Sequence, residues 1–423
     1  MGRDFWLYFS GQLISQIGSA FTLFALPLLV FSLTHSATNL ALTTVAEFVP
    51  YLLFGLVLGA LVDRLPRKGL MVASDVARAL VIVLLPTLSL LGDLQLWTIY
   101  AVAFVQSTLG IVFSCGEFAA VPHLVGRDDL VAANGRIMAT NSAGGVVGPI
   151  LAGALVAVIS VSDLLFFDAC SFLVSALSLA VIRTTFDSTA DPARAGGRPS
   201  IRRDIADGLR FVWSHPVLRS ISIMMALINF VSATEYSQLV LFAQHVLHAT
   251  DSQTAVLFAA GAAGVVVVGL AAAPLRRHLS FAVCALGTLV VSGLSVAAMA
   301  LIGRYPAALV LWAAASGFGL LLNINTGSLR QALVPSHLYG RVVSVAGVLA
   351  WSAIPLGALV GAAAIRLTGD VAAVYAAGGI LTALIALAFA FSPLRHGDRY
   401  LASAAAEAGA AERAAAGVSG TPG

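Results

Sequence analysis

Charged residues are scarce in this sequence of 423 residues, and their scarcity indicates the solvent in which the chain folds. Only 10% of the residues are charged and 59% are hydrophobic, whereas a typical soluble domain has about 25% charged and about 45–50% apolar residues. So few charges cannot cover a water-soluble surface, which excludes a soluble enzyme and a disordered chain. The net charge of +3 is too small to indicate a nucleic-acid partner. We therefore expect most of the chain to lie in lipid.

Cysteine and nucleotide-binding motifs are also poorly represented. Cys115, Cys170 and Cys284 lie far apart in apolar runs, without a disulfide framework or metal-ligand spacing. No Gly-x-x-x-x-Gly-Lys phosphate loop occurs, which argues against ATP as the direct energy source. We expect no enzymatic activity, no metal and no cofactor.

Long apolar runs, in contrast, are abundant. A helix needs about 20 apolar residues to cross a bilayer, because it must satisfy its own backbone hydrogen bonds there. The sequence contains twelve such runs and predicts an all-α polytopic membrane protein with twelve transmembrane helices. The predicted spans are 5–32, 39–62, 70–92, 94–118, 133–160, 163–183, 217–247, 252–273, 279–302, 306–331, 340–367 and 370–392.

The basic residues predict how these spans are oriented. With the N-terminus in the cytoplasm, 20 of the 23 arginine and lysine residues are cytoplasmic, Arg304 and Arg366 are outside, and Arg78 lies within a span. This distribution follows the positive-inside rule. We therefore expect a multi-pass protein of a bacterial inner (plasma) membrane with both termini in the cytoplasm.

One long polar stretch, 184–216, separates six spans from six. Apolar residues recur at helical spacing from Ile201 to Trp213 among arginines and aspartates, which predicts an amphipathic helix along the inner membrane surface. The alanine-rich C-terminus is low in complexity. The predicted organisation is an N-terminal six-helix bundle, a cytoplasmic linker, a C-terminal six-helix bundle and a disordered cytoplasmic tail, at 1–183, 184–216, 217–392 and 393–423.

The two halves also repeat each other in sequence. Val121-Pro-His-Leu124, followed by Gly135-Arg136, recurs as Val334-Pro-Ser-His-Leu338, followed by Gly340-Arg341. The loop Gly59–Lys68 has a fainter echo in Gly269–His278, with Ala273 where the first loop has Asp63. Two halves in the same orientation indicate a parallel duplication with a cavity between them, open alternately to each side. A transporter is the expected consequence.

Several of these motifs resemble one known family. Gly59–Lys68 resembles the loop signature of the major facilitator superfamily, and Gly144–Gly153 resembles the antiporter signature of its drug–proton exporters, with Ala152 where glycine is usual. Gly11–Gln16, Ala46-Glu47, Leu130–Asn134 and Gly208–Pro216 are similar to the exporter branch that includes macrolide-efflux and enterobactin-exporter proteins. The resemblance runs from about residue 5 to 392. It implies two pseudo-symmetric six-helix bundles that export amphiphilic small molecules, such as a drug, antibiotic, siderophore or natural product, by proton antiport.

The resemblance also implies roles for the two motifs. One motif would form a gating latch between the halves, through Gly59, Asp63, Arg64, Arg67 and Lys68; the alternative is that its cations only set topology. The antiporter signature would form a water-free interface between the halves that prevents leak through the protein. Its residues are Gly144, Gly148, Pro149 and Gly153, and the alternative is ordinary packing of small residues.

Carboxylates inside spans are costly and are usually functional or paired. Glu235 is nearest to mid-membrane, Glu47 matches an acid of related exporters, and Asp168 lies in the sixth span. Each is a candidate to exchange the coupling proton; the alternative is a carboxyl that lines water or bonds to a neighbour. Asp75 and Arg78, three residues apart on one helix face, are predicted to form a structural ion pair.

A mainly apolar cavity suits amphiphilic, neutral or weakly charged solutes better than sugars or nucleotides. The resemblance implies which spans line the cavity, and their polar or aromatic residues are the candidate substrate contacts: Gln12, Gln16, Gln106, Asn141, Asn229, Tyr236, Gln238, Asn323, Asn325 and Trp351. Amides can instead hold helices together. We expect a monomer whose partners are a small-molecule substrate, protons and the lipid bilayer. A metabolite–proton symporter and a transport-dead membrane sensor or scaffold stay open as alternatives.

Overall fold

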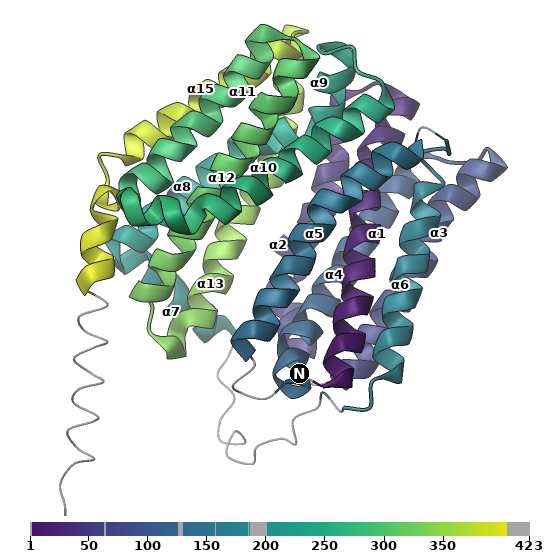
Figure 1. Cartoon of the computed structure of the whole chain (residues 1–423), viewed down its shortest axis with the longest axis horizontal. Coiled ribbons are helices and arrows are strands. Elements are labelled where there is room, and N and C mark those ends of the chain that lie inside the picture. Colours follow the sequence, from purple (N-terminus) through teal and green to yellow (C-terminus); the bar gives the residue numbers. More distant parts are fainter. Residues whose placement is uncertain are drawn as a thin grey trace, which may run out of the picture.

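The structure is a computed structural model that describes residues 2–62, 65–125, 130–156, 158–184, 186 and 201–403, and these residues are almost entirely helical (Figure 1). Among the described residues, eleven helical segments are long and apolar enough to cross a membrane, two of which combine two consecutive elements. A further helix, α5, contains a shorter apolar stretch, Val147–Val156. The predicted all-α membrane fold is confirmed.

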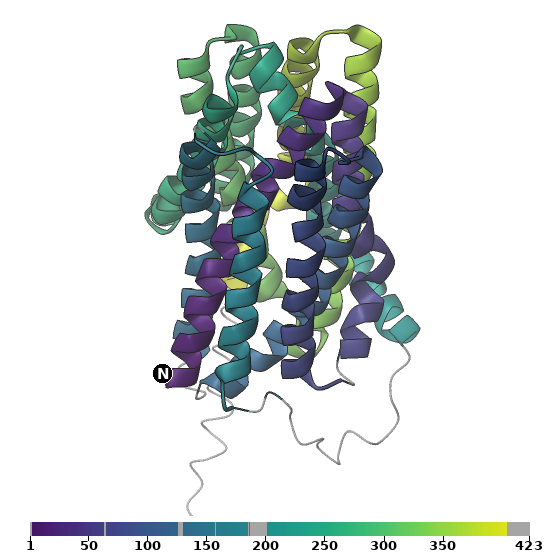
Figure 2. The same ribbon diagram turned by 90° about the vertical axis from the view of Figure 1, so that its right-hand side faces the viewer.

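Six helices form the first half of the chain, each matching one predicted span. They are α1 (Arg3–Thr34), α2 (Ala37–Val62), α3 (Arg67–Leu91), α4 (Leu96–Leu124), α5 (Leu130–Val156) and α6 (Leu164–Val181). Helix α1 packs against α5 and α6, α3 packs against α4 and α6, and α2 packs against α4. Figure 2 shows α1 alongside α6, with the N-terminus at one end of the bundle.

The second half has the same number of spans, several of which are interrupted. Its elements are α7 (Ile201–Ser214), α8 (Pro216–Ser237), α9 (Leu239–His245), α10 (Asp251–His278), the π-helix η3 (Val283–Gly287), α11 (Thr288–Ile302), α12 (Tyr305–Leu333), α13 (Ser336–Trp351), α14 (Ala353–Thr368), α15 (Val371–Phe389) and the 3₁₀-helix η4 (Pro393–His396). The seventh predicted span is α8 with α9, the ninth is η3 with α11, and the eleventh is α13 with α14.

Local sequence explains where several of these helices stop. Helix α13 ends at Trp351, four residues before Pro355, whose ring nitrogen cannot donate the hydrogen bond that would continue the helix. Gly92, Gly303 and Gly369 end α3, α11 and α14 with positive φ, a conformation that glycine adopts without steric strain.

Small residues let helices of the second half approach closely. Gly293 of α11 faces α15, where an added Cβ would lie 2.8 Å from the backbone nitrogen of Ala383. An added Cβ at Gly379 of α15 would lie 2.6 Å from the backbone nitrogen of Ala297. Helix pairs in lipid are held by such van der Waals packing, because lipid provides no hydrophobic driving force for their association.

The two halves touch near the end opposite the N-terminus. The rings of Phe24 and Phe258 are 5.6 Å apart between centroids, as are those of Phe31 and His245. Gln238 Nε2 donates a hydrogen bond of 2.8 Å to the carbonyl oxygen of Ala37. Toward the N-terminal end, α5 and α10 diverge (Figure 1). The structure is therefore closed at one end of the bundle pair.

The linker helix α7 packs against α13 as well as presenting apolar side chains outward. Asp207 Oδ2 lies 3.7 Å from Arg341 Nη1, and Val212 is fully buried. Leu209 and Trp213 remain exposed. Residues 185 and 187–200 of the linker lie outside the described residues.

The expectation of a disordered tail from residue 393 does not hold for residues 393–403. Ser392 Oγ accepts the N–H of Leu394 (3.2 Å) and caps η4, and the helical residues 397–403 follow. Leu394 is fully buried, and Tyr400 packs against the core of the second half. These apolar residues precede the alanine-rich stretch, and burying them stabilises an ordered backbone. Residues 404–423 lie outside the described part of the chain.

Candidate transport cavity and buried charges

A cavity of about 670 Å³ lies between the two halves, a volume typical of small-molecule sites. Most of its lining side chains are apolar, as the sequence predicts. The lining residues are Leu23, Pro27, Leu40, Thr43, Thr44, Glu47, Phe48 and Pro149 from the first half, and Asn229, Ser232, Ala233, Tyr236, Ser237, Phe258, Gly261, Ala262, Val265, Trp312, Ser316 and Ile354 from the second.

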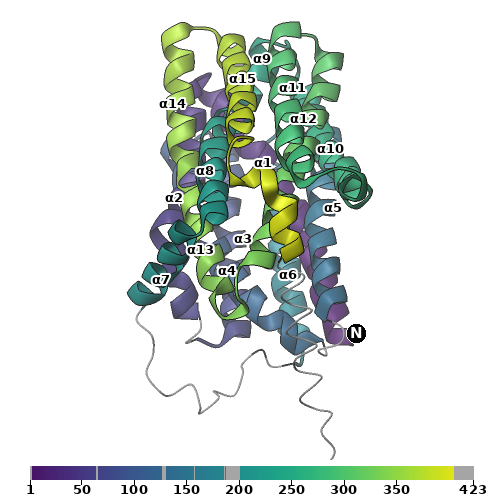
Figure 3. The ribbon, with the colours of Figure 1, turned by 90° about the vertical axis from the view of Figure 1, so that its left-hand side faces the viewer.

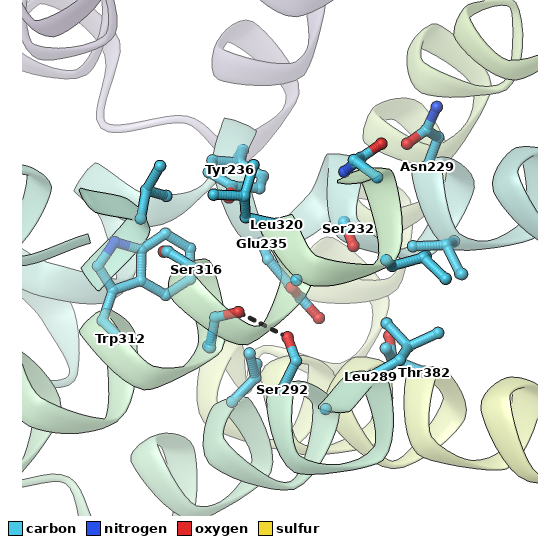
Figure 4. A pocket seen from close by; sticks show the side chains of 18 of the residues that line it. Asn229, Ser232, Glu235, Tyr236, Leu289, Ser292, Trp312, Ser316, Leu320 and Thr382 are labelled. Atoms are coloured by element: carbon cyan, nitrogen blue, oxygen red, sulfur yellow. Dashed lines mark hydrogen bonds between the residues drawn. The ribbon is translucent and has the colours of Figure 1, made fainter. Parts of the chain in front are cut away.

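A smaller pocket of about 230 Å³ lies within the second half, among α8, α10, α11, α12 and α15 (Figure 4). Glu235 lines this side pocket and is only 6% exposed. Its Oε1 and the Oγ1 of Thr382 are buried with no hydrogen-bond partner among the described residues. Such a polar pocket has room for several water molecules, which would satisfy these oxygens.

Two aromatic side chains stand where the side pocket adjoins the central cavity. Tyr236 and Trp312 line both spaces, and their rings meet edge to face with 5.3 Å between centroids. Figure 4 shows Glu235 and Tyr236, adjacent in sequence, directed to different sides of α8. Glu235 is therefore separated from the central cavity, whereas Glu47 lies in its wall.

A second group of buried charges lies inside the first half. Asp75 Oδ1 is 3.8 Å from Arg78 Nη1, an ion pair within α3. Asp75 Oδ2 accepts a hydrogen bond of 2.6 Å from Ser175 Oγ, and that hydroxyl accepts one of 2.9 Å from Gln12 Nε2. This chain of hydrogen bonds ties α1, α3 and α6 together.

The Arg78 guanidinium holds several further contacts. It lies 4.0 Å above the centre of the Phe172 ring, and its Nε donates to Gln106 Oε1 at 3.3 Å. Asp168, on α6, accepts hydrogen bonds from Thr22 Oγ1 and from Ser171 Oγ. Its carboxylate is thus held by hydroxyl groups, unlike that of Glu235.

The structure distributes the predicted cavity residues among several places. Tyr236 and Asn229 line both spaces, and Asn323 lines the side pocket. Trp351 meets the Tyr51 ring of the other half edge to face, with 5.1 Å between centroids. The side chain of Asn141 lies outside the described ones.

Other predicted residues serve packing instead of lining the cavity. Gln12 and Gln106 belong to the charged group of the first half. Asn325 Nδ2 donates to the Leu321 carbonyl at 2.7 Å, and Gln238 bonds across the closed end. An amide in lipid must find such a partner, so a sequence cannot distinguish a bonded amide from a cavity contact.

The cavity also contains residues that the sequence analysis missed. Trp312 and Ser316 lie four residues apart on α12 and line both spaces. Asn323, which the sequence analysis did name, follows at helical spacing and lines the side pocket. This polar stripe on one face of an apolar helix was a readable signal. Apolar contacts such as Phe48 and Phe258 carry no such signal, because apolar residues also cover the other faces of their helices.

The loop motif between α2 and α3 is only partly described, since Asp63 and Arg64 lie outside the described residues. Gly59 is within α2. Arg67 Nη1 donates to the Phe186 carbonyl at 3.4 Å, and Lys68 Nζ donates to the Ala180 carbonyl at 3.2 Å. Lys68 therefore binds a carbonyl in the last turn of α6, where the helix dipole favours positive charge. Arg67 binds a carbonyl of the segment that follows α6.

The glycines of α5 contact both halves of the protein. Gly144 lies against Gln16 of α1, where an added Cβ would be 2.9 Å from the Cβ of Gln16, and Gly148 packs on Ala20 of α1. Gly153 faces Ala255 of α10, with 2.7 Å between an added Cβ and that of Ala255. Pro149 lines the cavity. The motif is therefore a packing surface that continues across the interface between the halves.

A larger residue at Gly153 is expected to prevent the halves from meeting at the closed end. In Gly153→Val the added carbons would overlap Ala255, which should displace α10 from α5 and shift the conformational equilibrium toward opening of this end. We expect greater labelling by a membrane-impermeant maleimide of a cysteine placed at Ser252, beside Ala255. Gly55→Val, where nothing lies within 4 Å of an added Cβ, is the matched control. Unchanged labelling in Gly153→Val would contradict the expectation.

Two six-helix halves around an apolar cavity, with carboxylates inside the bundle, define a polytopic membrane transporter. The comparisons with known proteins identify the family. The sequence model of the Major Facilitator Superfamily matches residues 8–358, and the chain belongs to that superfamily.

Two of the curated relatives of the chain are named as efflux proteins. The multidrug efflux pump Tap of Mycolicibacterium fortuitum is 29% identical over 355 residues, covering 82% of this chain and 85% of the relative. Macrolide efflux protein A of Streptococcus pyogenes is 23% identical over 362 residues, covering 85% and 88%. These matches confirm the predicted resemblance to the exporter branch.

Solved structures show the same fold at low sequence identity. A bacterial homologue of the human lysosomal transporter Spinster, inward-facing and unoccupied, has a TM-score of 0.71 at 14% identity, covering 95% of this chain and 97% of that chain. A bacterial homologue of the iron transporter ferroportin, in an inward-facing state, has a TM-score of 0.62 at 17% identity, covering 92% and 99%.

Proposed function

We propose that the protein is a secondary active transporter that exports amphiphilic small molecules by proton antiport, as a monomer with alternating access. The observation that carries the proposal is the pair of neighbouring spaces between and within the halves. A mostly apolar cavity of about 670 Å³ can hold the cargo. The adjoining side pocket holds Glu235, whose unpartnered oxygen can take up a proton.

The charge distribution supports an orientation with both termini in the cytoplasm of a bacterial plasma membrane. In that orientation the closed end, where Gln238 bonds to Ala37, is extracellular. We infer that the cavity opens to the cytoplasm. The units that rock would be 1–183 and 217–392, joined by the linker 184–216, and the packed segment 393–403 would move with the second unit. An inward-open cavity is where an exporter receives its cargo.

Glu235 is our first candidate for the coupling acid, because its carboxyl has room for water and no bonded neighbour among the described residues. Glu47 is the second candidate, since it lines the cavity and can respond directly to cargo. Asp168 is the third, because Thr22 and Ser171 already bond to its carboxylate. A proton bound in one state and released in the other would couple the gradient to export.

The cargo class follows from the lining of the cavity. Its walls are largely apolar, with isolated hydroxyl, amide and carboxylate groups, which favours hydrophobic or amphiphilic solutes over sugars. The names of the relatives point to the same kind of cargo, namely several drugs in one case and macrolides in the other. We therefore propose antibiotics or similar natural products as the substrates.

Transport in proteoliposomes tests the proposal. Purified protein would be reconstituted in vesicles with a fluorescent hydrophobic drug on the cytoplasmic side of the protein, and a pH gradient, acidic on the other side, would be imposed. Export accelerated by the gradient supports the proposal. Cargo moving in the same direction as protons would instead indicate a symporter, and no flux under any gradient would indicate a sensor or scaffold. Protein-free vesicles measure passive leak.

A further inference from the structure

Helix α15 supplies one side chain to the side pocket and none to the central cavity. It packs against α8 and α11 in the second half (Figure 3). Among the described residues, Thr382 is its only contribution to the wall around Glu235, and none of the residues that line the central cavity comes from α15. A residue of α15 that takes part in transport would therefore act through Glu235 and not by touching the cargo.

The position of α15 along α8 is fixed at Glu235. Tyr375 is fully buried, and its hydroxyl donates a hydrogen bond of 2.5 Å to the backbone carbonyl of Glu235. Three residues further along α15, an added Cβ at Gly378 would lie 3.5 Å from Glu235 Oε1. The side chain of Glu235 therefore extends along α15 in the direction of Thr382, which is one turn beyond Gly378.

Thr382 lacks, among the described residues, the hydrogen bond that helical threonines often make to their own backbone. Thr254, Thr288 and Thr326 of the same half each donate to the carbonyl four residues earlier, at 2.7–2.9 Å. Thr382 is only 3% exposed, yet its Oγ1 has no partner in the described part of the chain. Because an unpaired buried hydroxyl is costly, this geometry indicates a partner inside the pocket.

The spacing of the two unpartnered oxygens fits one bridging water molecule. Gly378, which faces Glu235 Oε1, and Thr382 are four residues apart, about 6 Å along the axis of α15. Two hydrogen bonds of about 2.8 Å, joined at one water, cover nearly the same length. The pocket of about 230 Å³ has room for that water, and Figure 4 shows both side chains in its wall.

We propose that Thr382 is a positioning residue for Glu235: its hydroxyl holds a water molecule against the carboxyl, and the carboxyl exchanges its proton through that water. The water accepts the proton when the carboxyl ionises and donates one when the carboxylate is protonated. This inference rests on the proposed proton antiport and adds to it a residue of the last predicted span. Thr382 acts on the carboxyl and does not touch the cargo.

Thr382→Val removes the hydroxyl and keeps the shape of the side chain. We expect gradient-driven turnover in proteoliposomes to fall about three- to tenfold, the effect of one lost hydrogen bond, with the cargo KM unchanged. The unfolding temperature should not fall, because Thr382 Oγ1 bonds to no described residue. Thr382→Ser keeps the hydroxyl and should stay within about twofold of the wild-type rate.

Two controls separate the hydroxyl from packing. Thr326→Val is the matched control, because Thr326 is 2% exposed in the same half but donates to the Leu322 carbonyl of its own helix. It should transport at the wild-type rate. In a Glu235→Gln background, Thr382→Val should lower the gradient-driven rate no further, because glutamine has no proton to exchange.

An infrared measurement tests the inference without cargo. Difference spectra between acidic and alkaline pH, recorded on the protein in lipid, contain the C=O stretch of each carboxyl that takes up a proton. The band that disappears in Glu235→Gln belongs to Glu235. It should move to higher wavenumber in Thr382→Val, because a C=O group with fewer hydrogen bonds has a stiffer bond. It should keep its position in Thr382→Ser and in Thr326→Val.

With an active wild type, the inference is overturned if Thr382→Val transports at the wild-type rate, or if Thr382→Ser is as slow as Thr382→Val. The latter result would indicate a packing role. An absent Glu235 band, or one that does not move in Thr382→Val, would overturn it as well. If the wild type showed no gradient-dependent flux while the Glu235 band still moved in Thr382→Val alone, the proposed antiport would fail and the positioning role of Thr382 would stand.

Discussion

Replacing Glu235 with glutamine is expected to abolish the stimulation of export by a pH gradient. Glutamine has nearly the same shape but cannot bind and release a proton, so the two access states would no longer differ in charge at this position. Glu235 lies in the side pocket and not in the wall of the cargo cavity. We therefore expect a loss of at least about tenfold in gradient-driven rate, whereas cargo binding and downhill flux persist. Initial rates in proteoliposomes with and without the gradient measure this effect.

Two further variants make the result specific. Glu235→Asp keeps an ionisable group in the same pocket and should retain part of the stimulation. Glu47→Gln alters the cavity wall and should change cargo affinity in addition to rate. If Glu235→Gln kept the wild-type response to the gradient, the coupling acid would have to be sought at Glu47 or Asp168.

Replacing Arg78 with methionine should strongly destabilise the protein. The Asp75 side chain is 1% exposed and the Arg78 side chain 19% exposed, and Asp168 lies near the same guanidinium. Removing the cation leaves buried carboxylates without their compensating charge, which typically costs about 3–5 kcal/mol. We expect loss of the monodisperse peak in size-exclusion chromatography and a lower unfolding temperature in detergent.

A further variant separates the effect of uncompensated buried carboxylates from the loss of the packing contacts of Arg78. The triple variant Asp75→Asn/Arg78→Met/Asp168→Asn removes all three charges and should recover much of the lost stability. Arg304→Met, at an exposed position, should change the unfolding free energy by no more than about 0.5 kcal/mol. Should Arg78→Met prove as stable as wild type, the buried carboxylates must hold their protons and need no cation.

The fold was predictable from the sequence to a large extent. Each predicted span corresponds to a helix or to a pair of consecutive elements, because the length of an apolar run and the bilayer thickness are both local quantities. The interruption of the eleventh span could also be anticipated from Pro355, because proline lacks the backbone N–H that donates a hydrogen bond within a helix. The tail boundary was wrong because Leu394 and Tyr400 carry little signal until their packing partners are known.

The site was predictable only as a set of candidates. Glu235, Glu47 and Asp168 all appeared as acids in apolar runs, and nothing in their immediate sequence distinguished them. The structure distinguishes them by their surroundings: Glu235 lines a side pocket, Glu47 lines the cavity, and Asp168 accepts bonds from hydroxyl groups. Hydropathy gives the depth of a residue along a helix, but which neighbour it faces depends on how the helices pack.

The sequence by itself determined that this chain lies in a lipid bilayer, crosses it repeatedly and is built from two related halves. Composition, the length of apolar runs and internal repetition can be read without knowing which residues are in contact. Only the tertiary structure decided that Glu235 and Glu47 lie in different spaces and that Thr382 lines the pocket of Glu235. Those relations join residues far apart in the chain, and no periodicity or spacing encodes such a distance. They arise from the packing of whole helices, where each side chain meets atoms that its own sequence neighbourhood does not specify.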